Sequence, residues 1–196
     1  MTDGWGDFRE YLLAAATGVL ERFPEESRPE IYALSFRVWR VDDDKRRPYV
    51  AIGYNTESQY AAERRREDPD EARWNYACWL LDGFEMLGNC PEDPAGSALY
   101  VEEVRRLGLW FDGDEDAAEL DAARELLGRH FADACVRLAR DLHDSGRIEK
   151  VLGRPLPVVV FDMYCPGWEV EATRAANPPE LIEEFLAWQW AAEEEA

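Results

Sequence analysis

The sequence has few of the side chains that hold metals or attack substrates. It contains two histidines and four cysteines. His130 and His143 fall on one predicted helix about 140° apart, at roughly 100° per residue, so they cannot bind a single metal together. The cysteines are scattered without a C-x-x-C pair, which is typical of small buried thiols in a reducing compartment. We therefore expect no metal site.

The common short motifs of enzymes are also absent. The chain contains no G-x-S-x-G, no G-x-x-x-x-G-K-S/T, no G-x-G-x-x-G and no H-E-x-x-H. These absences argue against the nucleophile elbow, the phosphate loop, the dinucleotide fold and the zinc protease, and we expect no cofactor. Carboxylate hydrolases need only two acids that the fold brings together. The sequence therefore leaves the enzyme question open, with the balance against an enzyme.

Long apolar runs are missing as well. No stretch approaches the roughly 18 to 20 apolar residues that a membrane-spanning helix needs. The opening residues 1–4 lack the basic and apolar regions of a signal peptide. We expect an unprocessed cytoplasmic protein that does not bind membranes.

Basic residues are outnumbered by acidic ones. The chain has 22 Lys and Arg against 42 Asp and Glu, which gives a formal net charge of −20. A field of this sign repels nucleic acid and anionic lipid and speeds encounter with basic partners. We expect a basic protein as partner, although a solvated or salt-adapted surface explains the charge without one. A nucleic-acid mimic would need a one-sided acidic stripe, whereas the arginines at 64–66 and 105–106 interrupt the acids.

The hydrophobic content favours a folded chain. It reaches 46%, with eight Trp, eight Tyr and eight Phe, which is too rich for a disordered polymer. With 196 residues and neither a linker nor a repeat, one core is expected. We assign residues 1–190 to a single domain and 191–196 to an acidic C-terminal tail.

Periodicity near the start of the chain indicates a helix and a β-hairpin. Apolar residues recur at steps of three and four over 7–23, and Pro24 ends the predicted helix. Side chains then alternate over 31–41, which is the pattern of a strand with one drier face. Extended character resumes over 49–54 after a polar connection, so we expect the two strands to pair.

The middle of the chain is mostly helical by pattern. Thr56 followed by Gln59 matches a capping box, which predicts a helix over 57–67. The aromatic stretch 74–87 mixes helical spacing with closer neighbours, and we assign it to a helix.

Later segments add helices and one buried strand. We predict a short helix over 99–107 and a long one over 117–144, which Gly146 terminates. The apolar run 156–161 suits a strand buried on both faces. Asn177 and the prolines after it predict the start of a last helix. The fold class is therefore α+β, with a mixed or antiparallel sheet of about four strands packed with several helices.

Two acidic features resemble chemical sites. Residues 112–116 resemble the opening of a calcium loop, but its sixth and twelfth positions hold Ala117 and Ala123 in place of Gly and Glu. We interpret this segment as a loop before a helix. Asp162 follows the predicted buried strand, and a hydrolase or transferase that uses carboxylates including Asp162 is the alternative function. A role in a turn or cap is simpler.

Aromatic side chains offer a candidate interaction surface. Trp74, Tyr76 and Trp79, with Trp39 and Trp110 elsewhere, would form an exposed patch of the residue types that dominate protein interfaces. Packing in the core is the competing interpretation.

Four short motifs carry a resemblance to a known family. They are I-Y-A-L-S-F at 31–36, Y-N-T-E at 54–57, R-W at 73–74 followed by Trp79, and N-P-P-E at 177–180. In this order they resemble a bacterial family known as domain of unknown function forty-three-oh-three, over most of the chain. The resemblance implies no assigned activity and no catalytic residues.

The expected function combines these points. Asn55 and Glu57 of the second motif join Trp74, Tyr76 and Trp79 as the expected interaction residues. A small, acidic, cytoplasmic protein without a catalytic signature is similar in character to immunity proteins that neutralise toxins. We expect a non-enzymatic protein-binding domain, an immunity or regulatory protein that acts on a basic partner.

Overall fold

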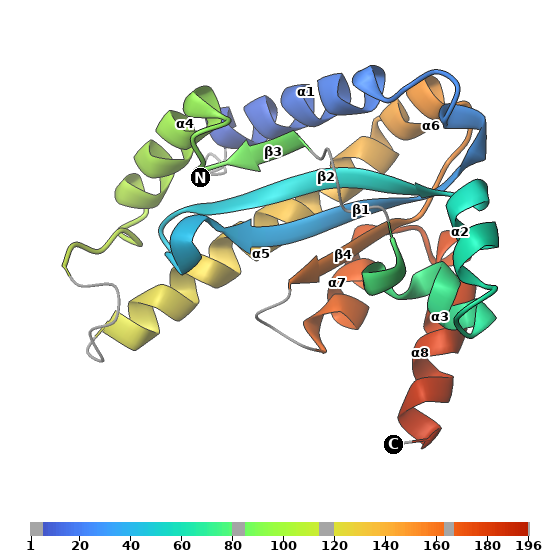
Figure 1. The fold of residues 1–196 in the computed structure, drawn as a ribbon. Helices are drawn as coiled ribbons and strands as arrows, with labels where there is room; N and C mark the ends of the chain where they lie inside the picture. The colour runs from blue at the N-terminus through green and yellow to red at the C-terminus, as the bar shows by residue number, and fades with distance from the viewer. Residues whose placement is uncertain (1–5, 80–84, 114–119, 163–166, 196) are drawn as a thin grey trace.

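The fold is built from one sheet and the helices that cover it (Figure 1). The structure is a computed structural model that describes residues 6–79, 85–113, 120–162 and 167–195. The helices are α1 (Gly6–Arg22), α2 (Glu57–Glu63), α3 (Pro69–Trp74), α4 (Pro94–Arg106), α5 (Asp121–Asp144), α6 (Arg147–Leu152), α7 (Trp168–Ala176) and α8 (Glu183–Glu195). The strands are β1 (Ile31–Arg40), β2 (Pro48–Thr56), β3 (Glu85–Gly88) and β4 (Val158–Asp162). None of the described helices is long and apolar enough to cross a membrane.

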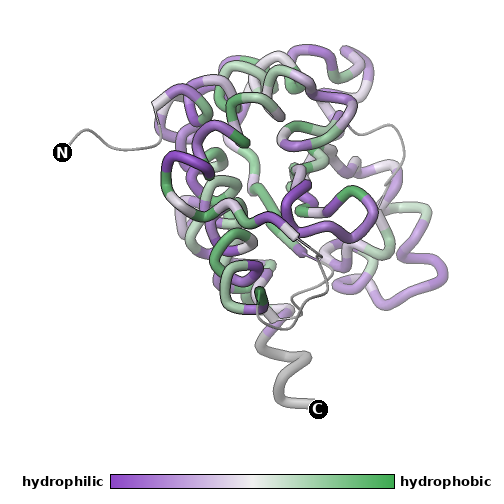
Figure 2. Tube along the Cα trace, turned by 90° about the vertical axis from the view of Figure 1, so that its left-hand side faces the viewer, coloured by the Kyte–Doolittle hydropathy of each residue, from purple (hydrophilic) through white to green (hydrophobic). Residues whose placement is uncertain are grey.

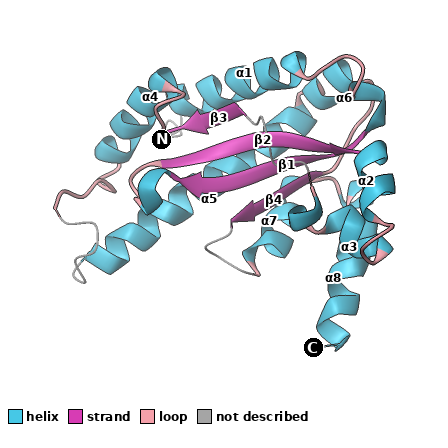
Figure 3. Ribbon diagram, viewed as in Figure 1, coloured by secondary structure: helices cyan, strands magenta, loops and turns pink. Residues whose placement is uncertain are grey.

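The four strands form a mixed sheet in the order β3-β2-β1-β4 (Figure 3). β1 and β2 pair antiparallel as the predicted hairpin, β2 and β3 pair antiparallel, and β1 and β4 pair parallel. This arrangement confirms the α+β class and the expected strand number. β3 and β4 are the two edges of the sheet, at some distance from each other in the sequence.

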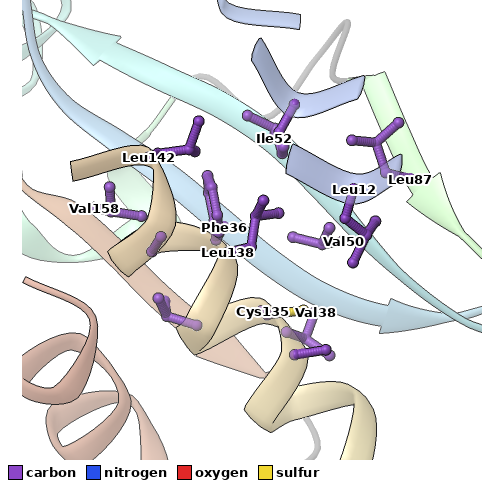
Figure 4. Close-up of a cluster of buried hydrophobic side chains, with 14 of the residues drawn as sticks. Leu12, Phe36, Val38, Val50, Ile52, Leu87, Cys135, Leu138, Leu142 and Val158 are labelled. Atoms are coloured by element: carbon purple, nitrogen blue, oxygen red, sulfur yellow. The ribbon is translucent and has the colours of Figure 1, made fainter. Parts of the chain in front are cut away.

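Hydrophobic side chains fill both faces of the sheet. One face carries Phe36, Val38, Val50 and Ile52, which pack against α1 and α5 (Figure 4). The opposite face carries a second cluster, made of Tyr32, Ala33, Trp74, Trp79, Val159, Phe161, Ile182 and Phe185. In Figure 2 the strands in the interior are mostly green, whereas outward turns of the helices carry much of the purple.

The segment predicted as a helix over 74–87 is different in the structure. α3 ends at Trp74, a short 3-10 turn follows over Tyr76–Cys78, and the chain then forms the edge strand β3. Residues 80–84 lie outside the described part. A strand of only four residues is too short to show a clear period of two, and it exists because it pairs with β2. The helix prediction for this segment was therefore wrong over its described residues after Trp74, apart from the single 3-10 turn.

Of the later helices, α4 and α5 follow the prediction, the last helix starts at a different residue, and α6 and α7 were not predicted. α5 continues without a break at Gly128, and Gly146 follows it with a φ of 66°, the left-handed backbone that suits a helix terminus. The part of that prediction at 117–119 lies outside the described residues. The last helix begins only at Glu183, after a 3-10 turn, and its backbone continues through 191–195. Asn177 does not cap it, because the Asn177 side chain binds the edge of β4.

Candidate functional site

The sequence-predicted residues gather around Tyr32 on the second face of the sheet. Asn55 sits in the register of β2 opposite Ala33, and its Nδ2 donates to the Tyr32 hydroxyl at 2.9 Å. That hydroxyl donates to the carbonyl oxygen of Arg73 at 2.7 Å. The indole Nε1 of Trp79 donates to the same carbonyl at 2.9 Å. These bonds join the first, second and third motifs of the family resemblance into one cluster.

The guanidinium of Arg73 holds the outer side of this cluster. It lies 4.3 Å from the ring centre of Tyr32 and 5.0 Å from that of Tyr60, distances at which a cation is attracted to an aromatic face. Arg73 Nη2 is 3.3 Å from Glu57 Oε1, and Arg73 Nε is 3.5 Å from Glu184 Oε2. Both carboxylates are mainly exposed, so these ion pairs lie at the surface. Burial raises the pKa of Tyr32 well above its usual value.

Burial decides which of these residues a partner could touch. Trp74 and Trp79 are each 5% exposed and Asn55 is 0% exposed, so they do not form the exposed patch that the aromatic pattern predicted. The rings of Trp74 and Trp79 make edge contacts with the ring of Tyr32, and Trp74 also contacts Phe185.

The other two expected interaction residues lie further out. Tyr76 is half-buried and stacks on Phe161, with ring centres 4.5 Å apart and planes 11° apart. Glu57 is exposed. Of the five expected interaction residues, solvent therefore reaches Glu57 and part of Tyr76. Trp39 and Trp110 are half-buried as well.

Asp162 is placed at the end of β4, as the sequence predicted, but it faces an arginine that the sequence did not single out. Arg40 Nη2 lies 2.9 Å from Asp162 Oδ2, and the two side chains are 7% and 4% exposed. The parallel pairing of β1 and β4 brings the two strand ends together, with Val38 opposite Asp162. Arg40 could have been found from its spacing, because it follows Phe36 and Val38 on the same face of an alternating strand.

A second buried polar pair lies between α4 and α5. His130 Nε2 is 2.8 Å from Glu103 Oε1, and both side chains are less than a tenth exposed. The nearby Tyr100 hydroxyl is buried without a hydrogen-bond partner. Burial raises the pKa of Cys135 on α5, and a thiol that resists deprotonation is a poor nucleophile. Among the described residues, no group of three or more His, Cys, Asp or Glu is arranged to hold a metal ion.

The outer edge of β4 is closed by side chains of α7. The Val160 N–H donates to Thr173 Oγ1 at 3.0 Å, and Thr173 Oγ1 donates back to the Val160 carbonyl at 3.3 Å. The Val158 N–H donates to Asn177 Oδ1 at 2.7 Å, and Asn177 Nδ2 donates to the Val158 carbonyl at 2.8 Å. His143 Nε2 is also 3.1 Å from Asn177 Oδ1. Sequence reasoning missed Thr173, although Thr173 and Asn177 share a helix face at i and i+4.

The described residues also form two open grooves. One lies between α1 and α5, has a volume of about 480 Å³, and contains the ion pair of Arg9 with Asp141 at 2.7 Å. The other, which we name the α1–β3 groove, has a volume of about 520 Å³. Its walls are β3, the loop at Glu92 and Asp93, and an α1 stripe made of Tyr11, Ala14, Ala15, Gly18 and Arg22. Asp162 lines neither groove.

Comparisons of the chain with protein-family models, with curated proteins and with solved structures found no match.

Proposed function

We propose that this protein is a non-enzymatic acidic domain that binds a basic protein partner, as an immunity or regulatory protein does. The observation that carries the proposal is the placement of its charge. Only three acids with described side chains are buried, namely Asp93, Glu103 and Asp162. Each of them is held by an internal partner. The rest of the described acids are exposed or half-buried. The net charge of −20 is therefore carried mainly at the surface.

A charge distribution of this kind favours a cationic partner. Its field attracts basic surfaces over about 10 Å at moderate salt and accelerates their encounter. The same field opposes contact with the phosphates of nucleic acid. Exposed arginines at 64–66 interrupt the acids locally, so the attraction is not uniform over the surface.

The alternative of a carboxylate enzyme finds less support. A general acid or nucleophile must reach its substrate, whereas the carboxylate of Asp162 is buried and bonded to Arg40. The grooves described above are lined by other residues. Two further parts belong to the same proposal. Membership of the bacterial family forty-three-oh-three rests on the sequence motifs, and a cytoplasmic location rests on the scattered cysteines.

The proposal is tested by binding measured against salt. The probes are the products of the genes that flank this one, together with hen lysozyme and cytochrome c as basic proteins and ovalbumin as an acidic control. Titration calorimetry at 20 and 200 mM NaCl should detect a complex with a flanking gene product or with one of the basic proteins, and its affinity should be lower at 200 mM. Ovalbumin should form no complex.

Paired variants sharpen this test. Changing the exposed Glu21, Glu25 and Glu26 to Gln should slow association, and changing the arginines at 64–66 to Gln should speed it, since the two sets alter the field in opposite directions. Absence of any complex, or binding that does not depend on salt, would contradict the proposal.

A further inference from the structure

The two edges of the sheet differ in how many of their outward backbone groups are hydrogen-bonded. At β4 the outward N–H and C=O groups of Val158 and Val160 are bonded to Thr173 and Asn177. At β3, among the bonds between described residues, one outward group is engaged, since the Gly88 N–H donates to Asp93 Oδ2 at 2.9 Å. Proteins usually close their sheet edges, because unpaired backbone groups attract other strands. An edge left open beside a groove therefore points to a binding role.

The register shows which groups of β3 are open. The Asn89 N–H donates to the Pro48 carbonyl at 2.8 Å, in line with the pairing of Gly88 with Tyr49. Antiparallel pairs alternate between bonded and non-bonded residues, so Leu87 and Glu85 face β2 while Met86 faces away from it. The N–H and C=O of Met86 therefore point outward from the sheet, and Met86 lines the α1–β3 groove.

The groove has the length of a short extended segment. Its α1 wall runs from Tyr11 to Arg22, which spans about 16 Å at 1.5 Å per residue. An extended chain advances about 3.3 Å per residue, so about five residues fit along this wall. Small side chains at Ala14 and Ala15 leave the middle of this wall without bulk, whereas the Arg22 guanidinium covers Gly18 and donates to Glu85 at the far end. In Figure 1, α1 runs alongside β3 at this edge of the sheet.

We propose that the α1–β3 groove binds an extended, basic segment of the partner protein, which adds to the sheet as a strand beside β3. The inference rests on the proposed function and assigns the surface that performs it. The backbone of the segment would donate to the Met86 carbonyl and accept from the Met86 N–H, which is strand addition at a sheet edge.

Charge favours a basic segment of a partner protein over a second copy of this chain as the occupant of the α1–β3 groove. Glu92 is exposed and lines the groove after the end of β3, whereas Glu85, at the start of β3, is in an ion pair with Arg22 at 2.5 Å. A Lys or Arg side chain of the segment would find Glu92 within the groove wall. A second copy would instead bring a net charge of −20 against an equal charge.

The test uses a labelled seven-residue peptide of alternating Lys and Val with blocked ends. Two control peptides accompany it, one with alternating Glu and Val, and one in which every second amide is N-methylated and cannot pair with a strand. In fluorescence anisotropy at 50 mM NaCl, we expect the Lys-Val peptide to bind and both controls to bind at least tenfold more weakly. In NMR, the peptide should slow amide exchange at Met86.

Variants of the full chain locate the binding. Met86→Pro removes the outward N–H without touching the pairs with β2, and it should weaken peptide binding at least tenfold, while Met86→Leu should bind like the parent. Ala14→Trp fills the groove from the exposed α1 side and should also weaken binding tenfold. If Met86→Pro fails to fold, Ala14→Trp and the exchange of the Met86 amide in the parent decide the question.

The outcomes separate this inference from the proposed function. If Met86→Pro and Ala14→Trp bind the peptide like the parent, or the N-methylated peptide binds equally well, the groove is not the site. If sedimentation shows a dimer of the parent that Met86→Pro abolishes, the occupant is a second copy and the inference is wrong. Salt-dependent binding of basic proteins that persists in both variants would overturn the groove and leave the proposed function standing.

Discussion

Arg40 and Asp162 form a buried ion pair that ties the ends of two parallel strands, β1 and β4, at a distance of 2.9 Å. Taking two charges out of water is costly, and their attraction repays this cost only while both are present. The pair therefore fixes the arrangement of the strand ends more than it adds to stability.

Breaking this pair from one side should be far more damaging than removing both partners. Arg40→Met and Asp162→Leu are each expected to lower the free energy of unfolding by about 3–5 kcal/mol, since each takes the opposite charge away from a buried group. The double variant Arg40→Met with Asp162→Leu should lose less than the sum of the two. Urea denaturation measures these values. Arg47→Met serves as control, because its partner Asp42 is 82% exposed and the loss should be about 0–1 kcal/mol. Additive losses would show that the two side chains act independently.

The Tyr32 hydroxyl should be a structural hydrogen-bonding centre. Tyr32→Phe removes the acceptor of Asn55 Nδ2 and one donor to the Arg73 carbonyl, and it should cost about 1–3 kcal/mol of unfolding free energy. Tyr60→Phe is the matched control, since its ring also lies under Arg73 but none of the described residues bonds its hydroxyl. Its effect should stay within about 0.5 kcal/mol. Equal losses in the two variants would refute the role assigned to Tyr32.

Thr173 should protect the edge of β4. Thr173→Val keeps the shape of the side chain but leaves the Val160 N–H without its acceptor, at a cost of about 1–3 kcal/mol. Amide hydrogen exchange at Val160 should become faster than in the parent. Thr173→Ser keeps the hydroxyl and should preserve the protection. Unchanged exchange at Val160 in Thr173→Val would mean that this bond does not close the edge.

His143 should make stability depend on pH near neutrality. Burial lowers the pKa of His143, more than the hydrogen bond with Asn177 and the charges of Asp144 and Glu180 raise it. The unfolded chain takes up this proton at about pH 6.5, whereas the folded chain does so only at lower pH. The unfolding free energy should therefore fall as the pH is lowered from about 7 through 6.5 toward the folded pKa.

His143→Gln should remove that part of the pH dependence. The measurement is the denaturation midpoint of the parent and of the variant between about pH 7 and 5.5, above the range in which most carboxylates titrate. A curve for His143→Gln that falls as steeply as that of the parent would show that another group is responsible.

Long, regular patterns were predicted correctly from the sequence. The helix at α1 and the hairpin of β1 and β2 follow from repeated spacing of apolar residues, and Thr56 accepts from the Gln59 N–H as its spacing predicted. Among the described residues no bond from the Thr56 N–H to the Gln59 side chain completes the box, and Gln59 Nε2 donates to Glu63 Oε1 further along the helix.

Features that depend on distant residues were not predictable. β3 exists through its pairing with β2, and Asn177 is drawn to β4 by backbone groups that a local pattern cannot show. In the candidate site the sequence named Asn55, Trp74 and Trp79 together but not their burial, since exposure depends on Tyr32 and Phe185 from other segments. The position of Asp162 was found, whereas its pairing with Arg40, 122 residues away, depends on the parallel contact of β1 with β4 and has no local signal.

The hydroxyl of Thr173 and the amide of Asn177 also set a limit on assembly. A fibre grows only from subunits that can be joined on both flanks, and in this molecule one flank is already filled by its own helix. Pairing of copies through β3 must therefore stop at two molecules, because the outward backbone groups of Val158 and Val160 on the β4 side of each copy are already bonded. This limit keeps the protein from growing into a fibre although its β3 edge is open.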